Sequence, residues 1–322
     1  MVRALTGTPA TLRPVSAPLP RDVWVARAQA HAERVDVLTA AHRERRGEGR
    51  SHPVEDFLFE YYHHSPAHLR RWHPGPGVAL ADAAGEERAG WTHYASADDG
   101  SVSLDVAAFM AKRGRTVTFV RDLLTATLSR PAHLGCFGLH EWAMVYGQDE
   151  DEVRHVGWPL RLGAKGTDEV VERHRIRCSH YDAFRFYTPP ARSLNLLQPT
   201  RESQVDLEQP GCLHAGMDVY KWAFKLAPAV PSELTADAFA LAKEIRELDM
   251  RAAPYDLREL GYEPIRIETA EGKAEYVERQ RGHTEASNAL RHRLIEVCDR
   301  LLAASPEASN APQASPFRPR LS

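Results

Sequence analysis

Helical periodicity is the feature of this sequence that most restricts its fold. Apolar residues recur at intervals of three and four over several long segments, as they do on one face of an α-helix. The segments predicted to be helical are residues 21–46, 54–64, 104–129, 137–146, 217–226, 233–250 and 275–302. Two short segments, 78–83 and 89–95, flank a turn-like Ala-Gly-Glu-Glu stretch and predict a β-hairpin. Residues 176–187 are rich in aromatic side chains, which favours a strand.

The predicted fold is therefore mainly α, within the α+β class: a single helical domain with a small β element. Residues 1–20 and 303–322 are rich in Pro, Ala and Ser and predict disordered tails on either side of a catalytic domain spanning 21–302. A chain of 322 residues is long enough to bury a large core. It contains no run of the roughly 20 apolar residues that a membrane span needs, so we expect no membrane partner.

Charge and cysteine content limit the classes of protein further. The chain has 41 Lys and Arg against 44 Asp and Glu, a formal charge of −3, so nucleic-acid binding would require a local basic groove. Four cysteines and the lack of a secretory segment indicate a reducing compartment, and we expect a cytoplasmic protein. The sequence also lacks the G-x-S-x-G, Walker A and G-x-G-x-x-G motifs of common hydrolases and nucleotide-binding proteins.

Polar segments that contain large aromatic residues are the main indication of a functional site. Five such segments mix His, Asp and Glu with aromatic side chains: residues 52–75, 135–142, 177–182, 211–218 and 267–275. Burying an ionisable group costs several kcal/mol unless the group is paired or coordinated. We therefore predict that these segments converge on a shared polar pocket. The alternative is a hydrogen-bonded core without a catalytic role.

Two spacings within these segments suit cooperating side chains. His180 and Asp182 would leave the same face of a strand. His214 and Asp218 would stack one turn apart on a helix. Each spacing fits either a histidine oriented by a carboxylate or a pair of metal ligands. For Asp218 the alternative is a place in the first turn of a helix, paired with a lysine of that helix.

Histidines are also the predicted ligands of a metal, either iron or zinc. The predicted ligands are His140, His180 and His214. A cysteine precedes each of them: Cys136, Cys178 and Cys212. The two Cys-x-His pairs, Cys178–His180 and Cys212–His214, could supply the four ligands of a zinc site. A separate hypothesis rests on two E-x-x-H pairs of the kind found in di-iron helical bundles, Glu60–His63 and Glu152–His155.

Several motifs resemble an actinobacterial family commonly named 3-methyladenine DNA glycosylase. The resemblance is carried by HPVEDFLFEYYHHSPAHLRRWHPG (52–75), GCFGLHEWAMVYG (135–147), RCSHYDAFRFYT (177–188), EQPGCLHAGMDVYKWAFKL (208–226), LDMRAAPYDL (248–257) and IETAEGKAEY (267–276). It implies hydrolysis of the N-glycosidic bond of an alkylated purine in double-stranded DNA. Such an enzyme flips the damaged nucleotide out of the duplex, and a carboxylate then stabilises positive charge on the sugar.

The residues that would serve this reaction follow from the same motifs. The catalytic candidates are Glu141, Asp182 and Asp218, together with His180 and His214. The candidates for binding the substrate are Trp142, Tyr181 and Trp222, which would stack on the base, and Arg70, Arg71 and Arg113, which would contact phosphates. The competing prediction is a metal-dependent enzyme, with iron or zinc, that acts on a small molecule through its His, Asp and Glu cluster.

Overall fold

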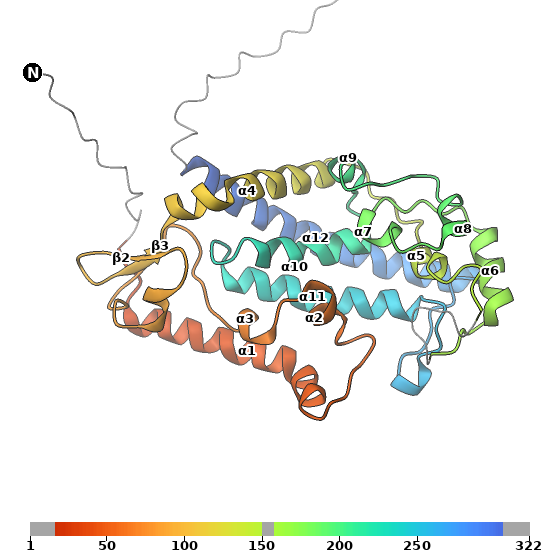
Figure 1. Cartoon of the computed structure of the whole chain (residues 1–322), viewed down its shortest axis with the longest axis horizontal. Helices are drawn as coiled ribbons and strands as arrows, with labels where there is room; N and C mark the ends of the chain where they lie inside the picture. Colours follow the sequence, from red (N-terminus) through yellow and green to blue (C-terminus); the bar gives the residue numbers. More distant parts are fainter. Residues whose placement is uncertain (1–16, 150–157, 305–322) are drawn as a thin grey trace, which may run out of the picture.

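The computed structural model describes residues 17–149 and 158–304 (Figure 1). Over these ranges the chain forms twelve α-helices and one small antiparallel sheet, which confirms a mainly α fold with a small β element. The α-helices are α1 (Arg21–Gly47), α2 (Phe57–Tyr62), α3 (Pro66–Leu69), α4 (Val106–Leu128), α5 (Leu139–Ala143), α6 (Gly163–Arg173), α7 (Tyr181–Phe184), α8 (Pro189–Arg192), α9 (Gln204–Leu207), α10 (Leu213–Lys225), α11 (Ser232–Arg251) and α12 (Ala270–Ala303). Two 3₁₀ helices, η1 (Glu87–Gly90) and η2 (Arg258–Leu260), lie between them. Among the described helices, none combines the length and apolar character that crossing a membrane requires.

Helix α10 is the centre of the fold. It packs against α11 and α12, and α12 packs in turn against α4 (Figure 1). Every residue of α10 from 213 to 223 is buried, as expected for a helix enclosed on all sides. The polar residues of this helix, His214, Asp218 and Lys221, are therefore held inside the protein.

The starts of two long helices are fixed by side-chain caps. The Asp105 carboxylate accepts a hydrogen bond from the backbone N–H of Ala108 at the start of α4. The Thr269 hydroxyl accepts one from Gly272 at the start of α12. Gly272 packs so closely that a Cβ atom there would lie 2.0 Å from the Arg266 carbonyl oxygen, so this turn requires glycine.

The sheet differs from the predicted hairpin. Strands β1 (Ala79–Leu80) and β2 (Tyr94–Ser96) both pair with β3 (Val102–Leu104), in the order β1-β3-β2, and not with each other. The hairpin prediction was wrong because much of the segment between β1 and β2 forms η1 and turns. The predicted N-terminal tail also ends earlier than residue 20, because Leu19 bridges to Leu80 beside the sheet. Residues 1–16 and 305–322 of the two predicted tails lie outside the described residues.

The long helices were predicted correctly and the short elements less well. α1, α11 and α12 cover their predicted segments. α4 begins two residues after and ends one residue before its predicted bounds of 104 and 129, and α10 begins four residues before the predicted start at 217. The strand predicted at 176–187 does not form. Its aromatic residues are instead packed by the four-residue helix α7 and the turns beside it.

Candidate functional site

Two clusters of buried donor atoms lie around α10. The first donor group is His140 of α5, His214 of α10 and Asp249 of α11. The second donor group is His180, Glu208 and Asp218, which come from the start of α7, the end of α9 and the middle of α10. In each group, one ligand atom from each residue lies within 4.8 Å of the others, a spacing that a metal ion could bridge.

The first donor group combines two imidazoles with one carboxylate. His140 Nε2 lies 3.0 Å from Asp249 Oδ1 and 3.2 Å from Asp249 Oδ2. Asp249 Oδ1 nevertheless accepts no hydrogen bond from a described residue. The His214 ring stands edge-on to the His140 ring, with 4.3 Å between their centres, and makes no hydrogen bond to any residue in the described ranges.

The pKa shifts of this group differ between its two histidines. Burial, reinforced by the neighbouring His140, holds the pKa of His214 well below its usual value, so this imidazole is neutral. Burial opposes the charged forms of His140 and Asp249 as well. Their mutual attraction is stronger, so the pKa of His140 rises and that of Asp249 falls. His214 and Asp249 are therefore in the forms that bind metals, whereas His140 would have to release a proton to bind an ion.

Arg246 supports the first donor group from α11. Its Nη1 donates to Glu141 Oε1 at 2.9 Å and to Asp249 Oδ2 at 3.4 Å. Its guanidinium carbon also lies 3.8 Å from the centre of the Phe57 ring. Glu141, a predicted catalytic residue, therefore lies at the site but is paired with Arg246.

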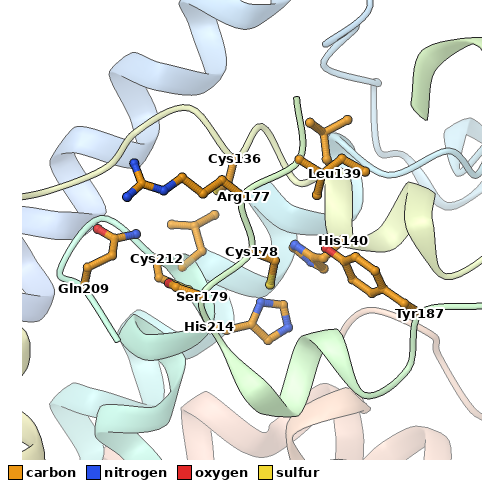
Figure 2. Close-up of a pocket in the computed structure, with 12 residues that line it drawn as sticks. Cys136, Leu139, His140, Arg177, Cys178, Ser179, Tyr187, Gln209, Cys212 and His214 are labelled. Atoms are coloured by element: carbon orange, nitrogen blue, oxygen red, sulfur yellow. The ribbon is translucent and has the colours of Figure 1, made fainter. Parts of the chain in front are cut away.

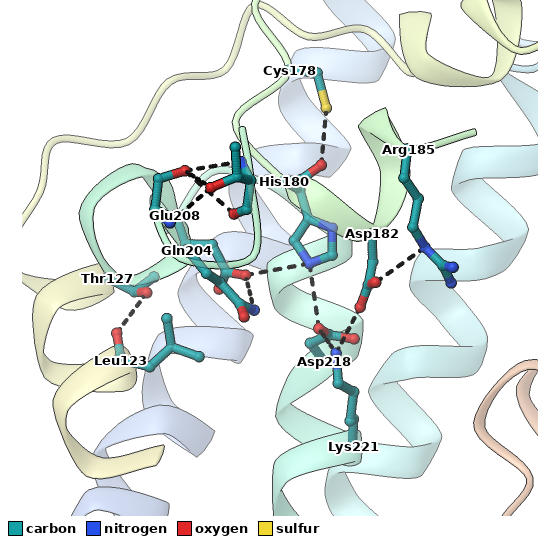
Figure 3. A network of polar contacts seen from close by, with 12 residues as sticks. Leu123, Thr127, Cys178, His180, Asp182, Arg185, Gln204, Glu208, Asp218 and Lys221 are labelled. Carbon is teal, nitrogen blue, oxygen red and sulfur yellow. Dashed lines mark hydrogen bonds and ion pairs between the residues drawn. The ribbon is translucent and has the colours of Figure 1, made fainter. Parts of the chain in front are cut away.

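The second donor group is joined to a wider network of polar contacts (Figure 3). His180 Nε2 lies 3.3 Å from Asp218 Oδ2 and 3.4 Å from Glu208 Oε1. Tyr62 donates to Asp218 Oδ1 at 2.8 Å, and Gln204 Nε2 donates to Glu208 Oε1 at 2.6 Å. These outer contacts fix the orientation of both carboxylates.

Lys221 gives the second donor group a cation of its own. Its Nζ donates to Asp218 Oδ2 at 2.6 Å and to Asp182 Oδ2 at 3.0 Å. Although burial opposes both charges, Lys221 and His180 hold the pKa of Asp218 far below its usual value, and Asp218 raises the pKa of Lys221. In the first donor group the cation is held less closely. Arg246 donates to Glu141 at 2.9 Å and to Asp249 only at 3.4 Å, so Asp249 is left mainly to the two imidazoles. The first group is therefore the better metal site.

The first donor group adjoins a small cavity (Figure 2). His140 and His214 line this cavity together with Cys136, Cys178 and Cys212. Its volume of about 20 Å³ is enough for about one water molecule. Burial raises the pKa of Cys178 to about 11, so this thiol stays protonated. Among the described residues, neither donor group contains a cysteine, so the zinc site predicted from the Cys and His spacing was wrong.

The predicted convergence of the three histidines is confirmed. The His214 ring lies 4.3 Å from the His140 ring and 5.4 Å from the His180 ring, measured between ring centres. The predicted pairing of His180 with Asp182 was wrong. Because α7 begins directly after His180, the two side chains do not share a strand face, and Asp182 pairs with Lys221 and Arg185 instead.

The E-x-x-H hypothesis finds no support in the described part of the chain. Glu60 and His63 are both exposed, and His63 ends α2 in a left-handed conformation. Neither residue belongs to a donor group. The second pair, Glu152 and His155, lies outside the described residues.

The three aromatic residues predicted to stack on a base lie on three different helices: Trp142 on α5, Tyr181 on α7 and Trp222 on α10. Trp142 is fully buried in the core, where its indole donates to the Ala252 carbonyl at 2.8 Å. Trp222 is 6% exposed and lies beneath the Lys221 ammonium. Tyr181 is half-buried on α7. No ring contact joins the three in the described structure, and their role in stacking on a base stays a prediction.

Of the predicted phosphate-binding arginines, Arg70 and Arg71 are adjacent and exposed, and Arg113 is half-buried on α4. Arg70 pairs with Asp36, and Arg113 donates to the Lys225 carbonyl. Arg71 lies over the Trp91 ring. None of these arginines lines the cavity beside the first donor group.

Three members of the site were missed by the sequence predictions. Asp249 and Glu208 complete the two donor groups, and Arg246 fixes Asp249. One signal was available in the sequence, because Asp249 follows Ala242 and Ile245 on one stripe of α11, where an apolar residue is expected. For Glu208, which follows α9, no periodic pattern pointed to burial.

No model of a known protein family, no curated relative and no solved structure matches this chain. The glycosylase resemblance and the excision of alkylated purines therefore remain predictions.

Proposed function

We propose that this protein is a metal-dependent enzyme with a non-haem iron centre, held by His140, His214 and Asp249. The convergence of these two imidazoles and one carboxylate carries the proposal. Such a set on an ion with open positions is typical of non-haem iron oxygenases. A bound iron ion would supply redox or Lewis-acid chemistry at its open positions.

The distances within the first donor group are compatible with coordination, although His140 Nε2 also makes a 3.2 Å hydrogen bond to Asp249 Oδ2. Two ligands that each lie about 2.1 Å from an ion at neighbouring octahedral positions are about 3.0 Å apart. His140 Nε2 and Asp249 Oδ1 are 3.0 Å apart, yet Oδ1 accepts no hydrogen bond from a described residue. A lone pair on Oδ1 is therefore available to an ion. His214 offers a neutral nitrogen beside it.

The surrounding residues have separate tasks in this proposal. Arg246 orients the Asp249 carboxylate, and such outer contacts commonly set metal affinity. The thiol-lined cavity gives access to the ion from the side of His140 and His214. Arg177 lines the same cavity and is exposed, so the cavity approaches the surface there. A substrate larger than a water molecule enters only if these lining side chains move.

Metal analysis tests the proposal. We expect protein purified without a histidine tag to contain, or to take up anaerobically, about one iron per chain. His214→Ala and Asp249→Asn should each lower iron affinity by about tenfold or more, because each removes a ligand. His292→Ala, which changes an exposed histidine of α12, is the matched control and should bind iron like the wild type.

Two results would contradict the proposal that this site binds a metal. One is a folded wild-type protein that binds no metal. The other is binding that survives both ligand substitutions. Stoichiometric zinc that iron cannot displace would contradict the assignment of iron.

A further inference from the structure

A groove lined by tryptophan and arginine is formed by residues between 21 and 91, whereas the residues of both donor groups lie between 140 and 249 of the sequence. It is formed by α1, the residues after α3 and the η1 region, and we call it the tryptophan–arginine groove. Its main side chains are Arg71, Arg88 and the half-buried Trp91, while Trp24 and Trp72 are only 3% and 2% exposed and lie beneath Arg88. Its volume of about 510 Å³ lies within the range of small-molecule binding sites, roughly 300–1,000 Å³.

Two arginines in this groove lack an acidic partner. The Arg88 guanidinium carbon lies 4.6 Å from the centre of the Trp24 ring and 5.3 Å from that of Trp91. The Arg71 guanidinium carbon lies 5.4 Å from the same Trp91 ring. Neither arginine forms an ion pair with a carboxylate of the described residues. The Arg88 guanidinium makes a single long hydrogen bond, 3.4 Å to the Trp72 carbonyl.

The other charged residues of the groove, except Glu87, are already paired. Arg21 pairs with Glu86, and Arg70 pairs with Asp36 outside the groove. Glu87 accepts a hydrogen bond from the Trp91 indole at 3.1 Å but forms no ion pair with a described residue. Its charge offsets one of the two unpaired arginines, so the groove keeps a net excess of one positive charge.

His73 lies beside the groove, edge-on to the Trp91 ring with 5.3 Å between ring centres. Mainly burial, and then the charges of Arg88 and Arg71, lower the pKa of His73 to about 3, so this histidine adds no positive charge. The groups that the groove offers to an anion are the guanidinium groups of Arg71 and Arg88.

The part of the groove formed by α1 includes the apolar side chains of Val25 and Ala28, and Val25 is 41% exposed. A ligand that uses both kinds of contact carries an anionic group and a flat apolar part.

We propose that this groove binds a phosphate-bearing aromatic ligand, the chemistry of a nucleotide, with its phosphate on Arg71 and Arg88. The planar guanidinium fork matches phosphate oxygens in pairs. Aromatic bases stack on indole rings and on guanidinium planes. A free nucleotide and a nucleic-acid strand both present this chemistry. The site is independent of the proposed metal centre.

Tryptophan fluorescence tests the groove, because three of the six tryptophans line it. The probes are AMP and a short oligothymidylate, each titrated into the full-length protein. We expect both to change the emission, and Arg71→Ala to weaken binding by about tenfold or more, the loss expected for one charge-assisted phosphate contact. Arg71 is exposed, so its removal should leave the fold intact. Arg115→Ala, at another exposed arginine, is the matched control and should bind like the wild type.

The two probes also identify the source of the ligand. Tighter binding of AMP indicates a free nucleotide. Tighter binding of the oligonucleotide, with a steep loss as salt rises, indicates a nucleic-acid strand. If neither probe binds, or if Arg71→Ala and Arg88→Lys bind both probes like the wild type, the proposal is overturned.

Discussion

The buried ion pair between Arg246 and Glu141 gives the sharpest prediction about stability. Arg246 is 1% exposed and Glu141 4%, and their 2.9 Å contact joins α11 to α5 beside the first donor group. Replacing Arg246 with Met leaves the Glu141 and Asp249 carboxylates buried with one fewer cation. We expect a loss of about 3–5 kcal/mol in the free energy of unfolding, the usual cost of breaking a buried pair from one side.

The size of this effect can be checked in a double-mutant cycle. Arg246→Met and Glu141→Gln should each be strongly destabilising, and the double variant should recover at least about 2 kcal/mol relative to the sum of the two. Urea and thermal unfolding of the metal-free protein measure these quantities. For a domain of this size, each kcal/mol lowers the melting temperature by roughly 2 °C.

An exposed pair on α6 is the matched control for this cycle. Arg173 and Glu169 form an (i, i+4) ion pair whose side chains are 75% and 42% exposed. Arg173→Met should change the free energy of unfolding by less than about 0.5 kcal/mol. If Arg246→Met costs no more than Arg173→Met, or if the cycle shows no coupling, the buried network does not have the role assigned to it.

Two further predictions concern the fold. The pKa of His73 is about 3 in the folded protein against 6.5 for a free histidine, so the unfolded chain takes up the proton first as the pH falls. The stability that this neutral histidine contributes is present above pH 6.5 and should shrink by about 2 kcal/mol between pH 7.5 and 5. Urea unfolding of the wild type and of His73→Gln over this pH range should show the difference. Equal pH slopes for the two proteins would refute it. Gly272→Ala should destabilise by about 2 kcal/mol or more, because its Cβ would overlap the Arg266 carbonyl. A Cβ atom at Gly282, on the same helix, would have no atom within 4 Å, so Gly282→Ala should stabilise the protein by about 0.5–1 kcal/mol. Equal effects of the two substitutions on the melting temperature would contradict this difference in packing.

The long helices could be predicted because their signal is local and repeated. α11 carries an apolar residue at nearly every third or fourth position, and one or two exceptions do not hide that pattern. The failures lie in short elements, where few residues carry the signal. The aromatic residues of 176–187 suit a strand as well as they suit the turns and the short helix that bury them.

The convergence of the histidines could be predicted, but their partners could not. His140, His180 and His214 lie in segments rich in large apolar residues, and all three are buried. Because a buried imidazole without a polar partner costs free energy, the sequence predicts that these residues meet in a shared polar site. The carboxylate that meets each histidine depends on how helices pack. Asp249 reaches His140 across 109 positions of the sequence, and only the tertiary structure determines such a pairing.

The location of a bound metal tests the central claim most directly. Crystals grown anaerobically with ferrous iron can be measured at the iron absorption edge, where anomalous scattering locates the ion. We predict one strong peak about 2.0–2.2 Å from a nitrogen of His140, a nitrogen of His214 and an oxygen of Asp249. A peak at another set of side chains, or no peak while the three residues stay as close together as described here, would contradict the claim.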